Sequence, residues 1–299
     1  MKKHLYLVCI LFSIKCYSQD PDSLKTQNAD SSIDKTEIVT TGEVKPQHPY
    51  KIKPGIDIPA MLLFDGWSLY GMNVIYNRDA VPESEILALN RNDVNKFDRP
   101  IIDNYSTNAK KIADYLFYGS MPFPLLLLAD KKIRKDGLKM GVLFLETMGA
   151  TGVIYTASAM MANRFRPYAY NPNVPMDTRT RGGARNSFFA GHPTVVATST
   201  FFMAKVYSDY HPNMKNKWIL YSIAGGLTAT CGLMRLQAGQ HFKTDVIVGL
   251  IVGPMVGVLV PQIHKNHPVG DNKLSLLPNF ENGATGFTAC YKLGGRHLH

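Results

Sequence analysis

Residues 235–263 have the sequence RLQAGQHFKTDVIVGLIVGPMVGVLVPQI, and this stretch decides the fold class. Its second part, 246–263, contains no charged residue, which predicts a helix in apolar surroundings. Gly249, Gly253 and Gly257 recur every four residues, so they share one helix face and allow a second helix to approach closely. The stretch therefore predicts a tightly packed helix, either in a membrane or in a soluble bundle.

Five further apolar segments precede this helix, at 56–76, 112–129, 140–162, 187–204 and 218–234. The uncharged runs 115–129, 147–163, 218–234 and 246–263 have 15 to 18 residues. These lengths are at or just under the about 20 residues that cross a bilayer, so length alone does not separate membrane helices from buried core helices. We predict an all-α fold, a bundle of five or six apolar helices, and expect it to be embedded in a membrane.

The composition limits the class of protein. The chain has 299 residues, of which 45% are hydrophobic and 19% charged, and 33 Lys and Arg against 23 Asp and Glu give a net charge of +10. These values exclude an acidic disordered protein and a collagen-like chain. The mean hydropathy is only -0.10, because polar end segments offset the apolar helices.

The N-terminus has the pattern of a secretory signal. Lys2 and Lys3 precede the apolar run 5–14, and small residues at Cys16 and Ser18 precede the expected cleavage site. We predict four segments: a signal peptide at 1–18, a flexible polar leader at 19–53, a helical domain at 54–264, and a C-terminal tail at 265–299 that forms a short hairpin or irregular structure. Only two cysteines follow the signal, which excludes a disulfide framework: Cys231 and Cys290.

The basic residues of two short loops predict an orientation. Loops 131–139 and 205–217 are rich in lysine, and the positive-inside rule places such loops in the cytoplasm. If the mature N-terminus is outside and 56–76 lies on the surface without crossing, the five later segments cross alternately. Residues 164–192 and 235–245 then share the outer face. We expect a bacterial-type cell envelope protein with its site facing the periplasm, or alternatively a soluble periplasmic protein.

Arginines are concentrated in the first of these outer regions. Between 164 and 185 the chain has five arginines and no lysine, and the planar guanidinium group suits phosphate oxygens. The alternative is a solvated basic loop that faces anionic lipid headgroups. The five are Arg164, Arg166, Arg179, Arg181 and Arg185.

Two histidines occupy positions that suit phosphate chemistry. Gly191-His192 precedes an apolar helix, and a helix N-terminus attracts anions. His241 and Asp245 are four residues apart on one helix face, where a carboxylate can hydrogen-bond to the imidazole and activate its other nitrogen. Taken alone, His192 is equally a capping or core residue, and His241 with Asp245 a structural pair. The other histidines have no motif context, and we expect them at the surface or in the tail: His4, His48, His211, His264, His267, His297 and His299.

Together these pieces resemble the signature of the type 2 phosphatidic acid phosphatase and vanadium haloperoxidase superfamily, in its membrane lipid phosphatase branch. The family pattern is K-x6-R-P, then P-S-G-H, then S-R-x5-H-x3-D. Arg166-Pro167 matches the first motif, Gly191-His192 the second, and Arg235, His241 and Asp245 the third. The chain departs from the pattern at four positions: Ala159, Phe189, Ala190 and Met234 stand where the family has Lys, Pro, Ser and Ser.

The resemblance implies an acid-phosphatase-type hydrolysis that needs no cofactor and no metal. His241 would attack phosphorus, Asp245 would orient it, and His192 would protonate the leaving group, with a phosphohistidine as intermediate. Arg166, Arg235 and the Gly191 backbone N–H would bind the phosphate oxygens, with Arg164 supplying some of the charge of the missing lysine.

The apolar helices beside the site favour a lipid phosphate as substrate: lipid A, undecaprenyl pyrophosphate or a phosphatidate-type lipid. The basic balance thus indicates phosphate and membrane rather than nucleic acid, and no oligomeric state is predicted. Three alternatives remain open: a secreted non-specific acid phosphatase of the same superfamily, a vanadate-dependent haloperoxidase, and a non-catalytic membrane binding protein with a degenerate site.

Overall fold

The computed structural model describes residues 48–266, 274–281 and 284–291. The chain divides into two compact units, one of which is 48–266. The other includes a hairpin in which β1 (Leu274–Glu281) pairs antiparallel with β2 (Ala284–Tyr291), Leu274 opposite Tyr291. The predicted signal peptide and the leader up to residue 47 lie outside the described residues.

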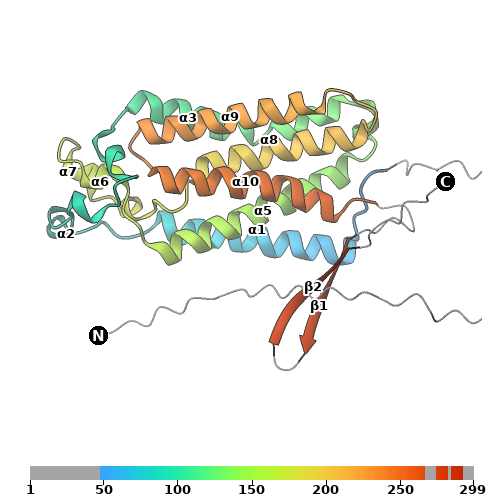
Figure 1. Ribbon diagram of the computed structural model, residues 1–299, viewed down its shortest axis with the longest axis horizontal. Helices are drawn as coiled ribbons and strands as arrows, with labels where there is room; N and C mark the ends of the chain where they lie inside the picture. The colour runs from blue at the N-terminus through green and yellow to red at the C-terminus, as the bar shows by residue number, and fades with distance from the viewer. Residues whose placement is uncertain (1–47, 267–273, 282–283, 292–299) are drawn as a thin grey trace, which may run out of the picture. The chain divides into compact units, whose positions relative to one another are not determined.

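The unit 48–266 is a helical bundle, which confirms the predicted all-α class. Its long helices run side by side (Figure 1). There are six of them in the described residues: α1 (Pro54–Tyr76), α3 (Thr107–Ser120), α5 (Gly137–Ala162), α8 (Gly191–Tyr210), α9 (Lys217–Gln237) and α10 (Lys243–Ile263).

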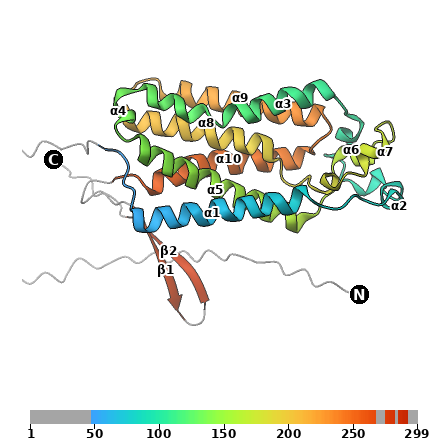
Figure 2. The same ribbon diagram turned by 180° about the vertical axis from the view of Figure 1, so that it is seen from behind.

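Short helices gather at the two ends of the bundle. One end, called here the loop end, carries α2 (Glu83–Leu87), α6 (Pro167–Tyr170) and α7 (Met176–Arg179), together with the 3-10 helices η1 (Arg91–Asp93), η2 (Arg99–Asp103) and η4 (Gly182–Arg185). The other, called the basic end, carries η3 (Phe123–Ala129) and α4 (Lys131–Arg134), which precede α5. Figure 2 shows α4 and the group of α2, α6 and α7 at opposite ends.

Helix α1 lies alongside α5 and runs in the same direction. A Cβ added to Gly149 would lie 2.5 Å from the Asp65 carboxylate, and one added to Gly71 would lie 2.5 Å from the Thr156 side chain, so residue numbers rise together along the contact. Helix α1 thus packs along α5, which is a candidate span, but α1 is not itself a candidate in the described residues. The expectation that 56–76 lies on the surface without crossing stays a prediction.

The glycine row of α10 packs against α8, as the sequence predicts. A Cβ added to Gly253 would lie 2.5 Å from the Ala197 Cβ, and one added to Gly257 would lie 2.6 Å from the Thr198 carbonyl oxygen. Gly249, one turn earlier, also faces α8. The absence of side chains at these three positions is what lets the two helices approach so closely.

Among the described residues, four segments are long and apolar enough to cross a membrane: 107–129, 137–170, 217–237 and 243–263. Helix α8, predicted to cross, is not one of these candidates in the described part of the chain. It packs against α3, α5, α9 and α10, so its side chains face protein rather than lipid. Its buried hydroxyls bond to carbonyls, as Thr200 does to Val196 at 2.7 Å and Ser199 to Ser120 at 2.5 Å. A helix enclosed in this way does not need high hydropathy.

The outer faces of the other helices expose many large apolar side chains. Soluble monomers rarely expose such extended apolar surface, whereas the hydrocarbon core of a bilayer requires it. Residues of this kind on α1, α3, η3 and α9 include Leu62, Leu63, Leu69, Tyr115, Leu125, Trp218 and Leu233. The exposed surface agrees with the four candidate spans.

The helical unit begins earlier than the predicted boundary at residue 54. Tyr50 is 1% exposed, and its hydroxyl donates to the Asp209 carboxylate at 2.7 Å. The Asn266 backbone N–H donates to the Pro49 carbonyl at 2.7 Å, and His48 bonds to Asp136 at 2.7 Å. Residues 48–53 are therefore packed rather than flexible, and the unit starts and finishes at the basic end.

The position of residue 48 at the basic end bears on two predictions from the sequence, the orientation of the lysine-rich loops and the export signal. The lysine-rich loops put the basic end in the cytoplasm, whereas a cleaved export signal would put residue 48, at that same end, outside. The two predictions agreed only because segment 56–76 was not counted as a crossing. If α1 also crosses the membrane beside α5, only one of the two predictions can hold.

Candidate active site

His241 lies at the loop end, in the turn that precedes α10. Its side chain is buried, and Nδ1 lies 2.7 Å from the Ser187 carbonyl oxygen. Since a carbonyl only accepts hydrogen bonds, Nδ1 carries the proton and Nε2 carries the lone pair. Burial lowers the pKa of His241 well below its usual range, and the positive charges of Arg166 and Arg235 lower it further. The imidazole is thus neutral at neutral pH.

Asp245 does not orient His241 directly, in contrast to the sequence-based expectation. Its Oδ2 accepts hydrogen bonds from the Ser187 hydroxyl at 2.6 Å and from the Phe242 backbone N–H at 2.9 Å. The backbone carbonyl of Ser187 in turn accepts a hydrogen bond from His241 Nδ1. Asp245 therefore holds His241 indirectly, through Ser187, which sequence reasoning missed.

Arg164 has two carboxylate partners. Its Nη1 bonds to the Asp245 carboxylate, and its Nη2 donates to Asp98 Oδ2 at 2.8 Å. The guanidinium carbon lies 4.4 Å from the centre of the Phe242 ring. These contacts show that Arg164 holds Asp245, and its contact with a bound phosphate stays a prediction.

Asp98 is a second residue that the sequence did not reveal. It is fully buried and accepts hydrogen bonds from the Thr244 backbone N–H at 3.0 Å and hydroxyl at 2.6 Å. Burial acts to raise the pKa of Asp98, but hydrogen bonds from Thr244, Arg164 and Asn95 outweigh it and leave the pKa below its usual range. The Asp98 carboxylate is thus ionised, and its hydrogen bonds with Thr244 hold the first turn of α10 in place.

Arg166 and Arg235 converge on one amide side chain. The Gln240 Oε1 accepts from Arg166 Nη1 at 2.8 Å and from Arg235 Nη2 at 3.4 Å. Both arginines are buried, and the Nε of Arg235 makes no hydrogen bond. Arg235 also lies 3.3 Å from the Asp114 carboxylate, so the two arginines with Asp114 carry one net positive charge, which an anion would balance. This pair is the part of the site that fits a phosphate group.

His192 connects the arginines to α3. Its Nε2 lies 3.0 Å from Asp114 Oδ1, and the same oxygen lies 3.3 Å from Arg235 Nη1. The imidazole stacks on Phe117 with the ring centres 4.4 Å apart. The His192 side chain is 19% exposed, while His241 is almost fully buried, so His192 lies on the open side of the site. Asp114 carries no motif signal and was not predicted.

Gly191 is the first residue of α8, where backbone N–H groups have no partner within the helix. A Cβ at this position would lie 2.8 Å from the Tyr155 ring, so the close approach of α5 and α8 requires glycine. Tyr155 lies one turn before Ala159, the position at which the family motif has lysine. The Gly191 N–H is thus held beside the site by direct packing on Tyr155.

The remaining loop arginines do not contribute to this group. Arg179 donates to the Ala169 carbonyl at 2.9 Å, and Arg185 bonds to Glu85. Arg181 is exposed and lies 4.0 Å from Asp177. Of the five arginines between 164 and 185, only Arg166 belongs to the cationic pair that it forms with Arg235. The other predicted site residues, His241, His192, Arg235 and Gly191, gather around it, with Asp245 behind Ser187.

Parts of this chain are similar to known proteins. Residues 140–268, which include every predicted site residue, match the family model described as PAP2 superfamily. An undecaprenyl-diphosphatase from Sulfolobus acidocaldarius is 26% identical over 153 residues, covering 51% of this chain and 66% of the relative, just under two thirds of its length. A solved transmembrane PAP2 type phosphatidylglycerolphosphate phosphatase from Bacillus subtilis is 21% identical, with a TM-score of 0.42, covering 69% of this chain and 94% of that chain.

Proposed function

Because the chain belongs to the PAP2 superfamily, we propose that it is a membrane phosphatase that hydrolyses the phosphomonoester or pyrophosphate of a lipid. The observation that carries the proposal is that a neutral, buried imidazole, His241, lies near two buried arginines, Arg166 and Arg235. The Nδ1 of His241 is bound to Ser187, which leaves Nε2 free, and Arg166 and Arg235 lie close enough to lower its pKa.

The reaction proceeds in two steps. In the first, the lone pair of His241 Nε2 attacks phosphorus, the bond to the leaving oxygen breaks, and a phosphohistidine forms. In the second, water attacks phosphorus and the bond to His241 Nε2 breaks. This step releases inorganic phosphate and restores the free imidazole. Arg166, Arg235 and the Gly191 N–H hold the three other oxygens, whose charge they stabilise in both transition states. A covalent intermediate of this kind replaces one difficult displacement with two easier ones.

His192 supplies the proton that the leaving oxygen needs. Its Nε2 lies 3.0 Å from Asp114. Burial and the charge of Arg235 lower the pKa of His192 to about 4, and the Asp114 carboxylate offsets part of this by favouring the protonated imidazole. A bound phosphate adds negative charge beside the ring, which favours protonation further. After the first step, neutral His192 takes a proton from the attacking water. This chemistry uses only the side chains named here and assigns no step to a metal ion.

A lipid is the favoured substrate because the bundle around the site exposes apolar side chains. The undecaprenyl-diphosphatase from Sulfolobus acidocaldarius indicates an isoprenoid pyrophosphate as one candidate. Phosphorylated lipid A and phosphatidate-type lipids have the same combination of an apolar chain and a terminal phosphate. A soluble acid phosphatase fits less well, since exposed residues such as Leu69 and Leu125 would face water.

We infer that the site faces the periplasm. The basic end carries Lys131, Lys132 and Lys135, and the loop end carries the site. The positive-inside rule concerns short loops of this kind, which favours a cytoplasmic basic end. The loop end then opens on the outer face of the membrane, where lipid phosphates of the cell envelope are exposed.

The proposal is tested by phosphate release from detergent-solubilised protein. Wild type, His241→Ala and His211→Ala are compared on lipid A, undecaprenyl pyrophosphate and phosphatidate. His211 is a matched control, because it also pairs with an aspartate, Asp130 at 3.0 Å, but lies at the basic end. We expect release by wild type and His211→Ala on at least one substrate, and a loss of at least about 1000-fold in His241→Ala. Equal release by wild type and His241→Ala on every substrate would mean a non-catalytic binding protein.

A further inference from the structure

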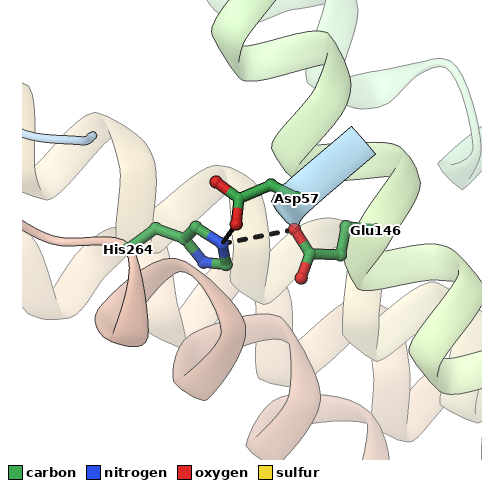
Figure 3. Close-up of side chains that lie close together, drawn as sticks. All are labelled: Asp57, Glu146 and His264. Carbon is green, nitrogen blue, oxygen red and sulfur yellow. Dashed lines mark ion pairs between the residues drawn. The ribbon is translucent and has the colours of Figure 1, made fainter. Parts of the chain in front are cut away.

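Three ligand-type side chains meet at the basic end, far from the phosphatase site. They come from three elements: Asp57 from the start of α1, Glu146 from α5 and His264 from the residue after α10 (Figure 3). His264 Nε2 lies 3.3 Å from Glu146 Oε2 and 3.6 Å from Asp57 Oδ1, and the three atoms lie within 4.8 Å of one another. The sequence had placed His264 at the surface or in the tail, and this is wrong.

The hydrogen bonds of His264 determine which way its lone pair points. Nδ1 lies 2.8 Å from the Val260 carbonyl oxygen, so Nδ1 carries the proton in the neutral ring. The lone pair of Nε2 then faces the oxygens of Asp57 and Glu146. Three hydrogen-bond acceptors that converge without a donor repel one another, so the cluster requires a positive charge at its centre.

The carboxylates confirm that the centre lacks a donor. Glu146 is 8% exposed, and its Oε2, the atom directed at His264, has no hydrogen-bond partner. Asp57 is also buried; its other oxygen, Oδ2, accepts from the Lys53 backbone N–H at 2.5 Å, which leaves Oδ1 for the cluster. An unpartnered buried carboxylate oxygen is costly unless a cation lies beside it.

We propose that Asp57, Glu146 and His264 bind a divalent metal ion of the zinc type. Zinc takes imidazole nitrogen and carboxylate oxygen at about 2.0–2.2 Å, and a tetrahedron with such bonds separates its ligand atoms by roughly 3.3–3.6 Å. The two measured separations from His264 Nε2, 3.3 and 3.6 Å, lie in this range. Water would take the fourth position. The bond from Nδ1 to a backbone carbonyl is also what metal-binding histidines usually make.

Charge favours a metal ion over a proton. Two carboxylates and a neutral imidazole carry a charge of −2, which a divalent ion balances fully. A proton on His264 would leave the buried group with one net negative charge. The metal would join α1, α5 and the end of α10, and α10 is about 32 Å long, so the ion takes no part in chemistry at the loop end. We therefore assign it a structural role.

The test measures metal content and thermal stability of the full chain. Protein purified with a tag that contains no histidine is stripped with a chelator, incubated with Zn²⁺ alone, dialysed, and assayed by elemental mass spectrometry. Wild type is compared with Glu146→Gln and His264→Gln, which keep the size and polarity of the side chains. His211→Gln is the control, because His211 lies at the same end of the bundle with one carboxylate partner. All variants keep His297 and His299, so any zinc at the C-terminus cancels in the comparison.

We expect wild type and His211→Gln to retain one more equivalent of Zn²⁺ than Glu146→Gln and His264→Gln, and to melt several degrees higher with Zn²⁺ than after stripping. Neither variant of the cluster should show this shift in Tm. If wild type retains no more zinc than His264→Gln, the centre is occupied by a proton and the metal proposal is overturned. If His211→Gln loses the same equivalent, the zinc binds elsewhere, and the assignment to these three residues is wrong.

Discussion

At the scale of single residues, the site depends on contacts behind the reacting atoms. His241 is held by a backbone carbonyl, that of Ser187, and the carboxylate of Asp245 acts on Ser187 rather than on the ring. A positioning contact of this kind keeps the imidazole in one tautomer and one orientation. It accounts for an aspartate four residues after the nucleophile without any direct bond between the two.

Asp245→Asn should lower kcat by about 10-fold to 100-fold and leave KM nearly unchanged, because the side chain touches no phosphate ligand. Ser187→Ala removes the hydroxyl that links Asp245 to the loop but keeps the carbonyl that binds His241. If the two residues act in one chain of contacts, the double variant should lose little more than Asp245→Asn alone. Losses that multiply would show that Asp245 acts independently of Ser187. Initial rates on the preferred lipid, at several concentrations, give both constants.

Asp114→Asn should weaken proton donation by His192, since it replaces the carboxylate 3.0 Å from the imidazole with a neutral amide. We expect kcat/KM for a lipid phosphate to fall by about 100-fold. The aryl ester p-nitrophenyl phosphate has a leaving group that needs little protonation, so its hydrolysis should fall far less. The comparison of the two substrates checks the role. An equal loss on both would assign Asp114 to phosphate binding through Arg235 instead.

At the scale of elements, the contact between α8 and α10 positions the site. His192 lies at the start of α8, and Asp245 in the first turn of α10. The glycine row lets the two parallel helices approach, and a Cβ at Gly253 would lie 2.5 Å from the Thr194 carbonyl oxygen. Overpacking this contact should therefore disturb both stability and the alignment of the two catalytic elements.

Gly253→Ala should lower the free energy of unfolding by about 1–3 kcal/mol, the usual cost of overpacking. Gly226→Ala in α9 is the matched control, because a Cβ there meets nothing within 4 Å. Thermal unfolding of both variants in the same detergent measures the difference. A Tm for Gly253→Ala equal to that of Gly226→Ala would contradict the close contact.

The elements also show what the sequence can and cannot predict. The glycine row and the spacing of Arg235, His241 and Asp245 are local patterns, so a close helix contact and a motif at the start of the last helix could be predicted, but not that the partner helix is α8. Asp114 bonds to a histidine 78 residues away, and Asp98 to a threonine 146 residues away. Such pairs have no local signature. The direction of α1 was missed for the same reason, since its partner α5 is distant in the chain.

At the scale of the whole molecule, the central question is which end of the helical unit faces the cytoplasm. The first and last described residues of the unit, 48 and 266, both lie at the basic end, where the Asn266 backbone N–H donates to the Pro49 carbonyl. The lysine-rich loops predict that this end is cytoplasmic. If α1 crosses the membrane as well, that orientation and a cleaved export signal at 1–18 make opposite predictions.

Cysteine labelling decides the orientation. Asp177→Cys at the loop end and Asn213→Cys at the basic end are made in a background without other accessible thiols; both positions are exposed. A thiol reagent that cannot cross membranes is added to spheroplasts. We expect Asp177→Cys to react at once and Asn213→Cys only after the membrane is permeabilised. The reverse pattern would place the site in the cytoplasm and support the export signal.

The most direct test of the account is to trap the phosphohistidine. Solubilised protein is mixed with its preferred lipid labelled with ³²P in the terminal phosphate, quenched in alkali within milliseconds to seconds, and digested for mass spectrometry. We predict a phosphate group that is stable in alkali and labile in acid, attached to the peptide that contains His241, in wild type and not in His241→Ala. Release of labelled phosphate by wild type with no label on His241 at any time point would contradict the mechanism.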